Sequence, residues 1–253
     1  MDNKQYRNRE WLYKKYWKED LSVEQIANIC KISNEGLRKW MKKYYISRRS
    51  HSEANHLRRG NSCKLSKKAI EWINGELLGD GCLVSQYQYS ARFVYGSKYL
   101  EYIEYIKNTL DSFGINITGK IYKKQDKKRG NISYGYTSRA YEELAPIHKQ
   151  WYPNGKKIVP KNIKLTPLTL RQHYIGDGSL NHKKHNKPYV ILSTCGFTIP
   201  DVEWLVKYLF RLGFKAIRWP SRNIIGISTY STKDFINYIG ECPVKCYQYK
   251  WAY

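Results

Sequence analysis

The tripeptide Gly-Asp-Gly occurs twice in this chain, and each copy ends an apolar, helix-like stretch that leads into a strand-like run. The first copy closes residues 73–81 around Asp80, and the second closes residues 170–178 around Asp177. The two aspartates are separated by about the length of one small domain, which predicts a duplicated unit. Each copy would present one carboxylate from the end of a helix. Two such carboxylates meeting at a pseudo-twofold axis would form a divalent-metal site.

The net charge of the 253-residue chain is +24, far beyond what solubility requires, and it predicts a polyanionic partner. The length allows one large domain or two to three small ones. A membrane surface is also polyanionic. However, no run of about 18 apolar residues occurs, and the polar start Met1-Asp2-Asn3-Lys4 is unlike a signal peptide. We therefore expect a nucleic acid as the partner and no membrane.

The aromatic residues fit this expectation. The 24 tyrosines and 8 tryptophans can contact bases and phosphates, although core packing explains many of them equally well. The 6 cysteines are scattered, and the close pair Cys242 and Cys246 has no second pair to complete a zinc site. Unpaired thiols predict a reducing, intracellular location such as the cytoplasm, the nucleoid or an organelle matrix.

Residues 1–46 are expected to form a small all-helical module. Aromatic residues mixed with lysines over 10–17 predict a first helix, Ser22 can cap a second, and Ser33 can cap a third from Asn34 to about Tyr44. Segments 21–27 and 32–40 resemble a helix-turn-helix, whose last helix enters the major groove of DNA. Lys31 stands where this motif usually has a left-handed glycine, at a cost of about 1 kcal/mol. A helical bundle that binds only protein is the alternative.

The exposed side of the third helix and the residues after it supply the candidate DNA contacts of this region. Residues 47–68 are interpreted as a basic linker that follows phosphates without reading sequence, with a solvated tether as the alternative. The candidate contacts are Asn34, Arg38, Lys39 and Lys42 on the helix, and Arg48 and Arg49 in the linker.

From residue 69 onward the same order of elements is predicted twice: helix, two strands, helix, two strands, helix. In the first half, 69–160, helices are expected at 69–80, 100–113 and 140–151, and strands at 83–89, 91–95, 118–123 and 132–138. In the second half, 161–253, helices are expected at 168–177, 200–212 and 232–240, and strands at 185–193, 216–219 and 224–228. Gly114 and Gly213 each stop the middle helix of their half, which supports the duplication.

With both motifs in this setting, the chain resembles the LAGLIDADG homing endonucleases in their single-chain, two-motif form. The resemblance covers residues 69–253 and includes 154–163 before the second motif, 197–205 after its strands, and 247–250 near the end. It implies an α+β fold in which two pseudo-symmetric αββαββα halves form a DNA-binding β-saddle, with the helix-turn-helix domain added. It also implies a monomer that makes a double-strand break in a long DNA target by metal-dependent phosphodiester hydrolysis.

The resemblance implies that Asp80 and Asp177 are the catalytic metal ligands, with the carbonyls of Gly79 and Gly176 as weaker ligands. Hard oxygen ligands favour Mg²⁺, with Mn²⁺ or Ca²⁺ as substitutes. The resemblance also points to Lys157 and Lys250 as basic residues that polarise water or stabilise the transition state, with phosphate contact as the alternative.

The second motif departs from the family pattern. Arg171, Gln172 and His173 are bulkier than the residues through which motif helices usually pack. If Gln172 does not fit between the helices, they splay and the metal geometry suffers.

Side chains on the predicted strands alternate between the DNA and the covering helices, and the sequence leaves open which set faces the groove. Arginine with guanine, and glutamine or asparagine with adenine, are the expected pairings. The candidate groove-reading residues are Ser85, Gln86, Gln88, Arg92, Lys120, Tyr122, Lys124, Arg139, Lys183, Lys187, Arg218, Arg222 and Asn223.

Two other functions stay open. One is an RNA-binding intron maturase on the same fold, which would make intron RNA a partner. The other is a DNA-binding regulator that does not cut. The presence of both aspartates and both lysines favours cleavage, because binding alone needs neither.

Overall fold

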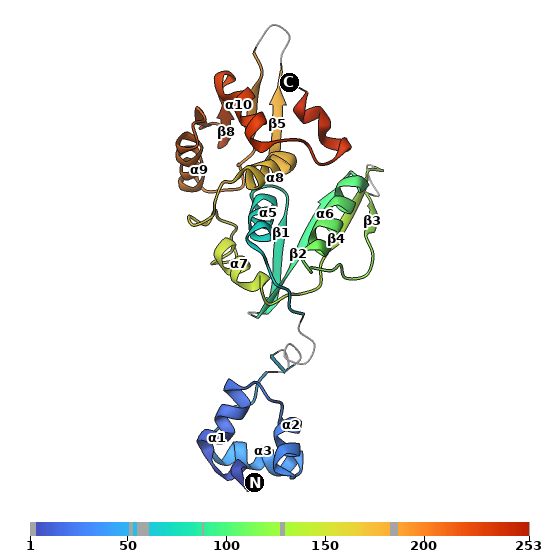
Figure 1. The fold of residues 1–253 in the computed structure, drawn as a ribbon, viewed down its shortest axis with the longest axis vertical. Helices are drawn as coiled ribbons and strands as arrows, with labels where there is room; N and C mark the ends of the chain where they lie inside the picture. The colour runs from blue at the N-terminus through green and yellow to red at the C-terminus, as the bar shows by residue number, and fades with distance from the viewer. Residues whose placement is uncertain are drawn as a thin grey trace. The chain divides into compact units, whose positions relative to one another are not determined.

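The computed structural model describes residues 4–50, 53–54, 61–87, 89–126, 130–182 and 187–252. Contacts divide the chain between Gly60 and Asn61 into two compact units, which Figure 1 shows as ribbons. In the part of the chain that is described, no helix is long and apolar enough to cross a membrane.

The N-terminal unit is helical, as expected. A short turn, η1 (Gln5–Arg7), precedes α1 (Arg9–Tyr13), which continues into a π-helical turn, η2 (Lys14–Lys18). Two further helices follow, α2 (Val23–Cys30) and α3 (Asn34–Lys43). Leu12, Ile26, Leu37 and Met41 from these helices are buried together in one core, which explains why such short helices are stable here.

Local signals in the sequence set the boundaries of α2 and α3. Ser22 and Gln25 form a complete capping box at the start of α2, and the Ser33 side chain accepts a hydrogen bond from Gly36 N at the start of α3. Lys31 adopts the left-handed conformation with φ 54°, so the turn that usually has glycine forms with lysine at a small cost.

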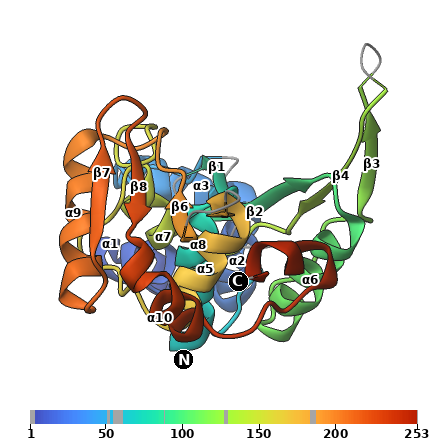
Figure 2. The same ribbon diagram turned by 90° about the horizontal axis from the view of Figure 1, so that it is seen from above.

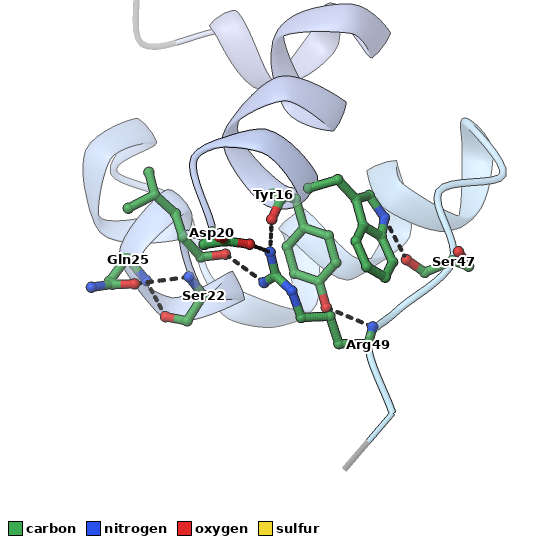
Figure 3. Close-up of polar contacts among 8 residues, drawn as sticks. Tyr16, Asp20, Ser22, Gln25, Ser47 and Arg49 are labelled. Atoms are coloured by element: carbon green, nitrogen blue, oxygen red, sulfur yellow. Dashed lines mark hydrogen bonds and ion pairs between the residues drawn. The ribbon is translucent and has the colours of Figure 1, made fainter. Parts of the chain in front are cut away.

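Arg49 is part of this unit rather than an exposed residue of a linker. Its side chain is only 4 % exposed and donates hydrogen bonds to Leu21 O (3.1 Å), to Tyr16 O and to Asp20 Oδ1 (3.0 Å). The guanidinium also lies over the Tyr16 ring, 4.2 Å from its centroid, as Figure 3 shows. These contacts correct the expectation that Arg49 follows DNA phosphates, because its donors are already bonded within the protein. Arg48 remains exposed.

The second unit contains two halves with the same order of elements. The first half has α5 (Lys67–Leu78), β1 (Cys82–Tyr87), β2 (Ser90–Ser97), α6 (Leu100–Ser112), β3 (Tyr122–Gln125), β4 (Ile132–Thr137) and α7 (Leu144–Trp151). The second half has α8 (Pro167–Asp177), β5 (Gly178–Asn181), β6 (Tyr189–Leu192), α9 (Ile199–Arg211), β7 (Ala216–Trp219), β8 (Ile224–Ile227) and α10 (Thr229–Ile239), followed by the 3-10 segment η3 (Lys245–Trp251). Both halves therefore have the expected αββαββα order of an α+β fold.

Each half forms one antiparallel four-stranded sheet, and the two sheets have matching strand orders. The orders are β1-β2-β4-β3 and β5-β6-β8-β7. Gly114 (φ 80°) and Gly213 (φ 91°) follow α6 and α9 in the left-handed region that favours glycine, as the duplicated sequence pattern predicts. The duplication is thus visible in both topology and turn chemistry.

Some elements begin later than expected. The strand predicted at 118–123 is β3, which starts at Tyr122, and the strand predicted at 185–193 is β6, which starts at Tyr189. The helix predicted at 140–151 starts at Leu144, because the preceding backbone is still bonded to β2. Ser138 N donates to Phe93 O and Tyr141 N donates to Ala91 O, each at 2.9 Å. Strand pairing therefore takes the place of the first helical turn.

The pairing register assigns the side chains of each sheet to two faces. One face packs on helices: Phe93 contacts Trp72 of α5, and Tyr95 contacts Tyr102 of α6. Figure 2 shows α5 and α8 at the centre, with α6 below β3 and β4 of the first sheet, α9 alongside β7 and α10 below β8 of the second. We call the opposite face of each sheet its open face. The open face of the first sheet presents Val84, Gln86, Arg92, Val94, Tyr122, Lys124 and Thr137, and that of the second presents Ser179, Asn181, Tyr189, Ile191, Ile217, Trp219, Ile224 and Gly226.

Candidate active site

The helices α5 and α8 pack against each other through glycine. A Cβ atom added to Gly75 would lie 2.5 Å from Thr169 O, and one added to Gly176 would lie 3.1 Å from Asp80 N. Only a residue without a side chain permits so close an approach of two backbones. The contact extends to the ends of both helices, so Asp80 and Asp177 leave from adjoining backbone.

The bulky residues of the second motif do not separate these helices. Gln172 is fully buried, and its Nε2 donates a hydrogen bond of 2.8 Å to Tyr105 Oη. Gly75 lies opposite and provides the space, since a Cβ added there would be 2.8 Å from Gln172 Cβ. The conflict expected from the sequence is resolved by pairing a large residue with a glycine.

The two carboxylates differ in exposure and act on each other electrostatically. Asp80 is exposed and Asp177 is half-buried. Burial raises the pKa of Asp177 to about 6, and the negative charge of Asp80 adds to this rise, while Lys157 and Lys250 oppose it. A pair of like charges held together at a partly dry position favours a bound cation.

The donor set fits a hard divalent cation. Two carboxylates converge here, and the carbonyls of Gly79 and Gly176 lie in the same backbone contact. Among the described residues, no group of three or more His, Cys, Asp and Glu side chains is arranged to hold a metal ion. A cation at this site would depend on two carboxylates, backbone oxygens and oxygens supplied by a substrate, all of which are hard ligands that suit a divalent cation.

One lysine lies at each motif. Lys157 Nζ donates to Gly79 O (3.1 Å) and Gly81 O (2.9 Å), and Lys250 Nζ donates to Ile175 O (2.6 Å) and Gly176 O (3.3 Å). Burial lowers the pKa of Lys250 to about 8, although Asp80 and Asp177 raise it. The structure thus brings the four predicted residues Asp80, Asp177, Lys157 and Lys250 to one place. Both glycine carbonyls named as weaker ligands accept hydrogen bonds from these lysines.

Two buried residues beside the site, Tyr95 and Glu76, were not predicted from the sequence. Tyr95 Oη donates a hydrogen bond of 3.5 Å to Asp80 Oδ2, and Tyr102 Oη donates one of 2.7 Å to Glu76 Oε1. Burial raises the pKa of Glu76 to about 8, which favours the protonated form of this carboxyl. An acidic residue within the apolar stretch before Asp80 was the available signal for Glu76. Tyr95 could be found only by knowing which face of β2 packs on the helices.

The first sheet gathers several candidate groove readers. Gln86, Arg92, Tyr122 and Lys124 all lie on its open face and are exposed. The Tyr122 ring covers Gly135 of the neighbouring strand, where an added Cβ would collide with it at 2.0 Å. Lys120 and Arg139 are exposed just outside the strands. Ser85 Oγ is bonded to Ser90 O (2.8 Å) instead of pointing outward, and Gln88 lies outside the described residues.

The second sheet corrects two expectations. Arg218 is paired with Ile225 on the helix-facing side and forms an ion pair of 3.7 Å with Glu203 of α9, so it does not face the groove. Asn223 donates to Phe197 O (2.9 Å) and has φ 49°, so it serves the turn between β7 and β8. Arg222 in this turn and Lys187 before β6 are exposed, whereas Lys183 lies outside the described residues.

In the N-terminal unit, the four residues of α3 that were predicted to contact DNA lie on its outward side. Asn34, Arg38, Lys39 and Lys42 are all exposed, and Arg38 lies 3.8 Å from Glu35 in a surface ion pair. A surface pair of this kind contributes little to stability and leaves the guanidinium accessible.

Two αββαββα halves that meet through glycine-lined helices, with an aspartate at or just after the end of each helix, define a protein of the LAGLIDADG fold. Residues 70–235 match the LAGLIDADG DNA endonuclease family, and the chain belongs to this family.

Three known proteins show how far the similarity extends. The homing endonuclease I-WcaI bound to its DNA recognition sequence superimposes with a TM-score of 0.63 and 21% sequence identity, over 82% of this chain and 95% of that chain. The uncharacterized protein MJ1098 of Methanocaldococcus jannaschii is 28% identical over 81% of this chain and 80% of its own length. The cytochrome b mRNA maturase bI2 of Debaryomyces hansenii is 27% identical over 57% of this chain and 56% of the maturase's own length.

Proposed function

We propose that this protein is a site-specific DNA endonuclease that makes a double-strand break by metal-dependent hydrolysis of one phosphodiester bond on each strand. The observation that supports this most is the convergence of Asp80 and Asp177 from the ends of two packed helices, each with its own lysine. One carboxylate from each half suits a duplex, whose two strands are related by a similar pseudo-twofold axis.

Divalent cations, with Mg²⁺ as the physiological choice and Mn²⁺ or Ca²⁺ as substitutes, would neutralise charge on the scissile phosphates and acidify water when bound. The protein's own contribution is to hold the carboxylates. Gly75, Gly79 and Gly176 fix the distance between the helices, and the lysine at each motif bonds the carbonyls at the helix end. Each ammonium also places positive charge beside a carboxylate, where negative charge develops on the phosphate during reaction.

The open faces of the sheets supply the DNA contacts in this proposal. Gln86, Arg92 and Lys124 are exposed on one face, and they are residue types that read base edges or bind phosphates. We also propose that the N-terminal unit is a helix-turn-helix domain whose α3 adds contacts through Asn34, Arg38, Lys39 and Lys42. The intact protein would act as a monomer, because both carboxylates come from one chain.

The experiment begins by finding the target. The full chain is used to select duplexes from a randomised library in Ca²⁺, and the selected sequence is cloned into a supercoiled plasmid. Linear plasmid formed on addition of Mg²⁺, and abolished by a chelator, supports the proposal. Tight binding without nicked or linear product argues for the regulator instead.

A maturase is the second candidate, since one relative is named as a cytochrome b mRNA maturase. The discriminating measurement is binding to structured RNA libraries beside the duplex library at equal salt. Selection of a specific RNA, with no specific duplex recovered, would replace the endonuclease with the maturase.

A further inference from the structure

The open faces of the two sheets differ in chemistry. The first presents Gln86, Arg92 and Lys124, whereas the second is built largely from apolar and aromatic side chains. Register and pairing place on that second face the residues Tyr189, Ile191, Ile217, Trp219 and Ile224. The only arginine within the described strands of the second sheet, Arg218, faces α9.

The apolar residues of the second face form a continuous platform around Gly226. A Cβ added to Gly226 would lie 2.8 Å from the Trp219 ring, so the indole covers this glycine. The absence of a side chain lets Trp219 of β7 meet Tyr189 of β6, with ring centroids 5.8 Å apart. Beside this pair, Ile217 is 62% exposed.

A cavity of about 490 Å³ adjoins the platform and reaches round β7 to the helix-facing side. Tyr189, Ile217, Trp219 and Gly226 line it together with Ala216, Ile227 and the exposed Phe210 of α9. A contiguous apolar surface on a chain of this charge is costly to leave in water, which indicates that a partner covers it.

Duplex DNA is the occupant that the surroundings favour. The platform is the counterpart, in a duplicated fold, of the face that presents Arg92 and Lys124, so one duplex crossing the first face continues onto the second. Lys187 and Lys215 lie together at one edge of the platform, each with its ammonium near the exposed Tyr230 ring, at 5.7 and 5.8 Å from the centroid. Two ammonium groups beside an apolar surface are suited to contact DNA phosphates at that edge.

The base edges of the major groove offer one apolar group, the C5-methyl of thymine. We propose that the second sheet reads thymine methyl groups through Ile217 and the Tyr189–Trp219 pair, so that the half-site under this sheet is specified by thymines. The half-site under the first sheet is read by hydrogen bonds from Arg92 and Gln86. This inference rests on the proposed function only in taking duplex DNA as the partner, and it does not require cleavage.

The test uses the full chain, the selected duplex and Ca²⁺. Deoxyuridine, which lacks only the C5-methyl, replaces every thymine first in one arm and then in the other. We expect the affinity to fall about fourfold for each contacted methyl in one arm, equivalent to ~0.8 kcal/mol, and to change less than twofold for the other arm.

Two variants test which arm of the duplex is read by which sheet. Ile217→Ser removes one of the proposed methyl contacts, so its preference for thymine over deoxyuridine duplexes is expected to be about fourfold smaller than that of the wild type. Arg92→Ala is expected to weaken discrimination between base pairs in the arm under the first sheet. Ile199→Ser, at an exposed isoleucine at the start of α9, is the matched control and leaves the thymine preference intact.

Several results would overturn the inference. One is deoxyuridine tolerated in both arms, and another is an Ile217→Ser protein whose thymine preference equals that of the wild type. Preferential capture of unpaired RNA or single-stranded DNA by the platform would assign it to base stacking instead. If no specific duplex is selected at all, the proposed function itself fails, which is a different outcome from a selected duplex without methyl dependence.

Discussion

Tyr95 Oη lies 3.5 Å from Asp80 Oδ2, and the residue at the equivalent place in the second half is Leu192. The equivalence follows from register, because Leu83 pairs with Phe93 three residues after Asp80, as Leu180 pairs with Val190 three residues after Asp177. Tyr95 and Leu192 each follow two residues later on the helix-facing side. The carboxylates of Asp80 and Asp177 are therefore held differently.

This asymmetry predicts unequal cleavage of the two strands in Tyr95→Phe. Removing a hydrogen bond worth roughly 1 kcal/mol should slow the step that depends on Asp80 by about two- to tenfold. Nicked plasmid would accumulate before linear product forms. Tyr136→Phe is the control, since that buried phenol bonds Ile115 O away from the site. Equal slowing of both strands, or the same nicking pattern in the control, would contradict a positioning role for Tyr95.

The glycine contact between α5 and α8 predicts a graded response to added methyl groups. Gly75→Ala would place a Cβ 2.5 Å from Thr169 O and should destabilise folding by about 1–3 kcal/mol in urea unfolding. Gly176→Ala, with its nearest contact at 3.1 Å, should lower cleavage more than it lowers stability, because Asp80 N must shift. Gly196→Ala meets nothing within 4 Å and should change neither. A stable, fully active Gly75→Ala protein is incompatible with this packing.

The buried side chain of His173 should make the folding stability of the protein sensitive to mild acid. Burial lowers the pKa of His173 to about 4 from the ordinary 6.5, so the folded protein binds fewer protons at this residue than the unfolded chain between these values. Stability should therefore fall as the pH drops from about 6.5 towards 4, by roughly 1 kcal/mol per pH unit. His173→Gln should flatten this slope in urea unfolding measured at several pH values. His182→Gln, at an exposed histidine, should not, and equal slopes for wild type and His173→Gln would refute the assignment.

Arg49 and Arg48 should separate stability from DNA binding. Arg49→Ala leaves Tyr16 O and Leu21 O without their donor, so faster amide hydrogen exchange is expected in α1, η2 and the start of α2. Arg48→Ala removes an exposed charge and should reduce affinity for duplex DNA without changing exchange. The reverse pattern would restore Arg49 to the DNA contacts.

The sequence was most informative where a local rule is strict. Local signals located most elements and the two aspartates of the candidate active site: the caps at Ser22 and Ser33, the left-handed stops at Gly114 and Gly213, and the paired Gly-Asp-Gly motifs. The two lysines of the site, Lys157 and Lys250, were indicated by the family resemblance instead. Each of the local signals depends on one or a few neighbouring residues. The face of the sheet on which a strand residue lies, and the residues that it contacts, depend instead on how the whole sheet is assembled.

The errors came from those non-local effects. The side chain of Arg218 faces the helices because of the register in which β7 pairs with β8. Arg49 turns inward because it bonds Tyr16 and Asp20, which lie about thirty positions earlier in the chain. The fit of Gln172 opposite Gly75 likewise depends on how two distant helices meet. Tyr95 was missed for the same reason, since its contact with Asp80 exists only after β2 folds against α5 and α6.

The most direct test of the account is plasmid cleavage by Asp80→Asn and Asp177→Asn, each compared with Asp234→Asn at an exposed aspartate of α10. Because both carboxylates serve one site, each motif variant should lose Mg²⁺-dependent linear product to below about one-hundredth of the wild-type rate while still binding the selected duplex. Asp234→Asn should cut normally. A motif variant that still breaks both strands at the wild-type rate would show that the two aspartates do not form a shared catalytic centre.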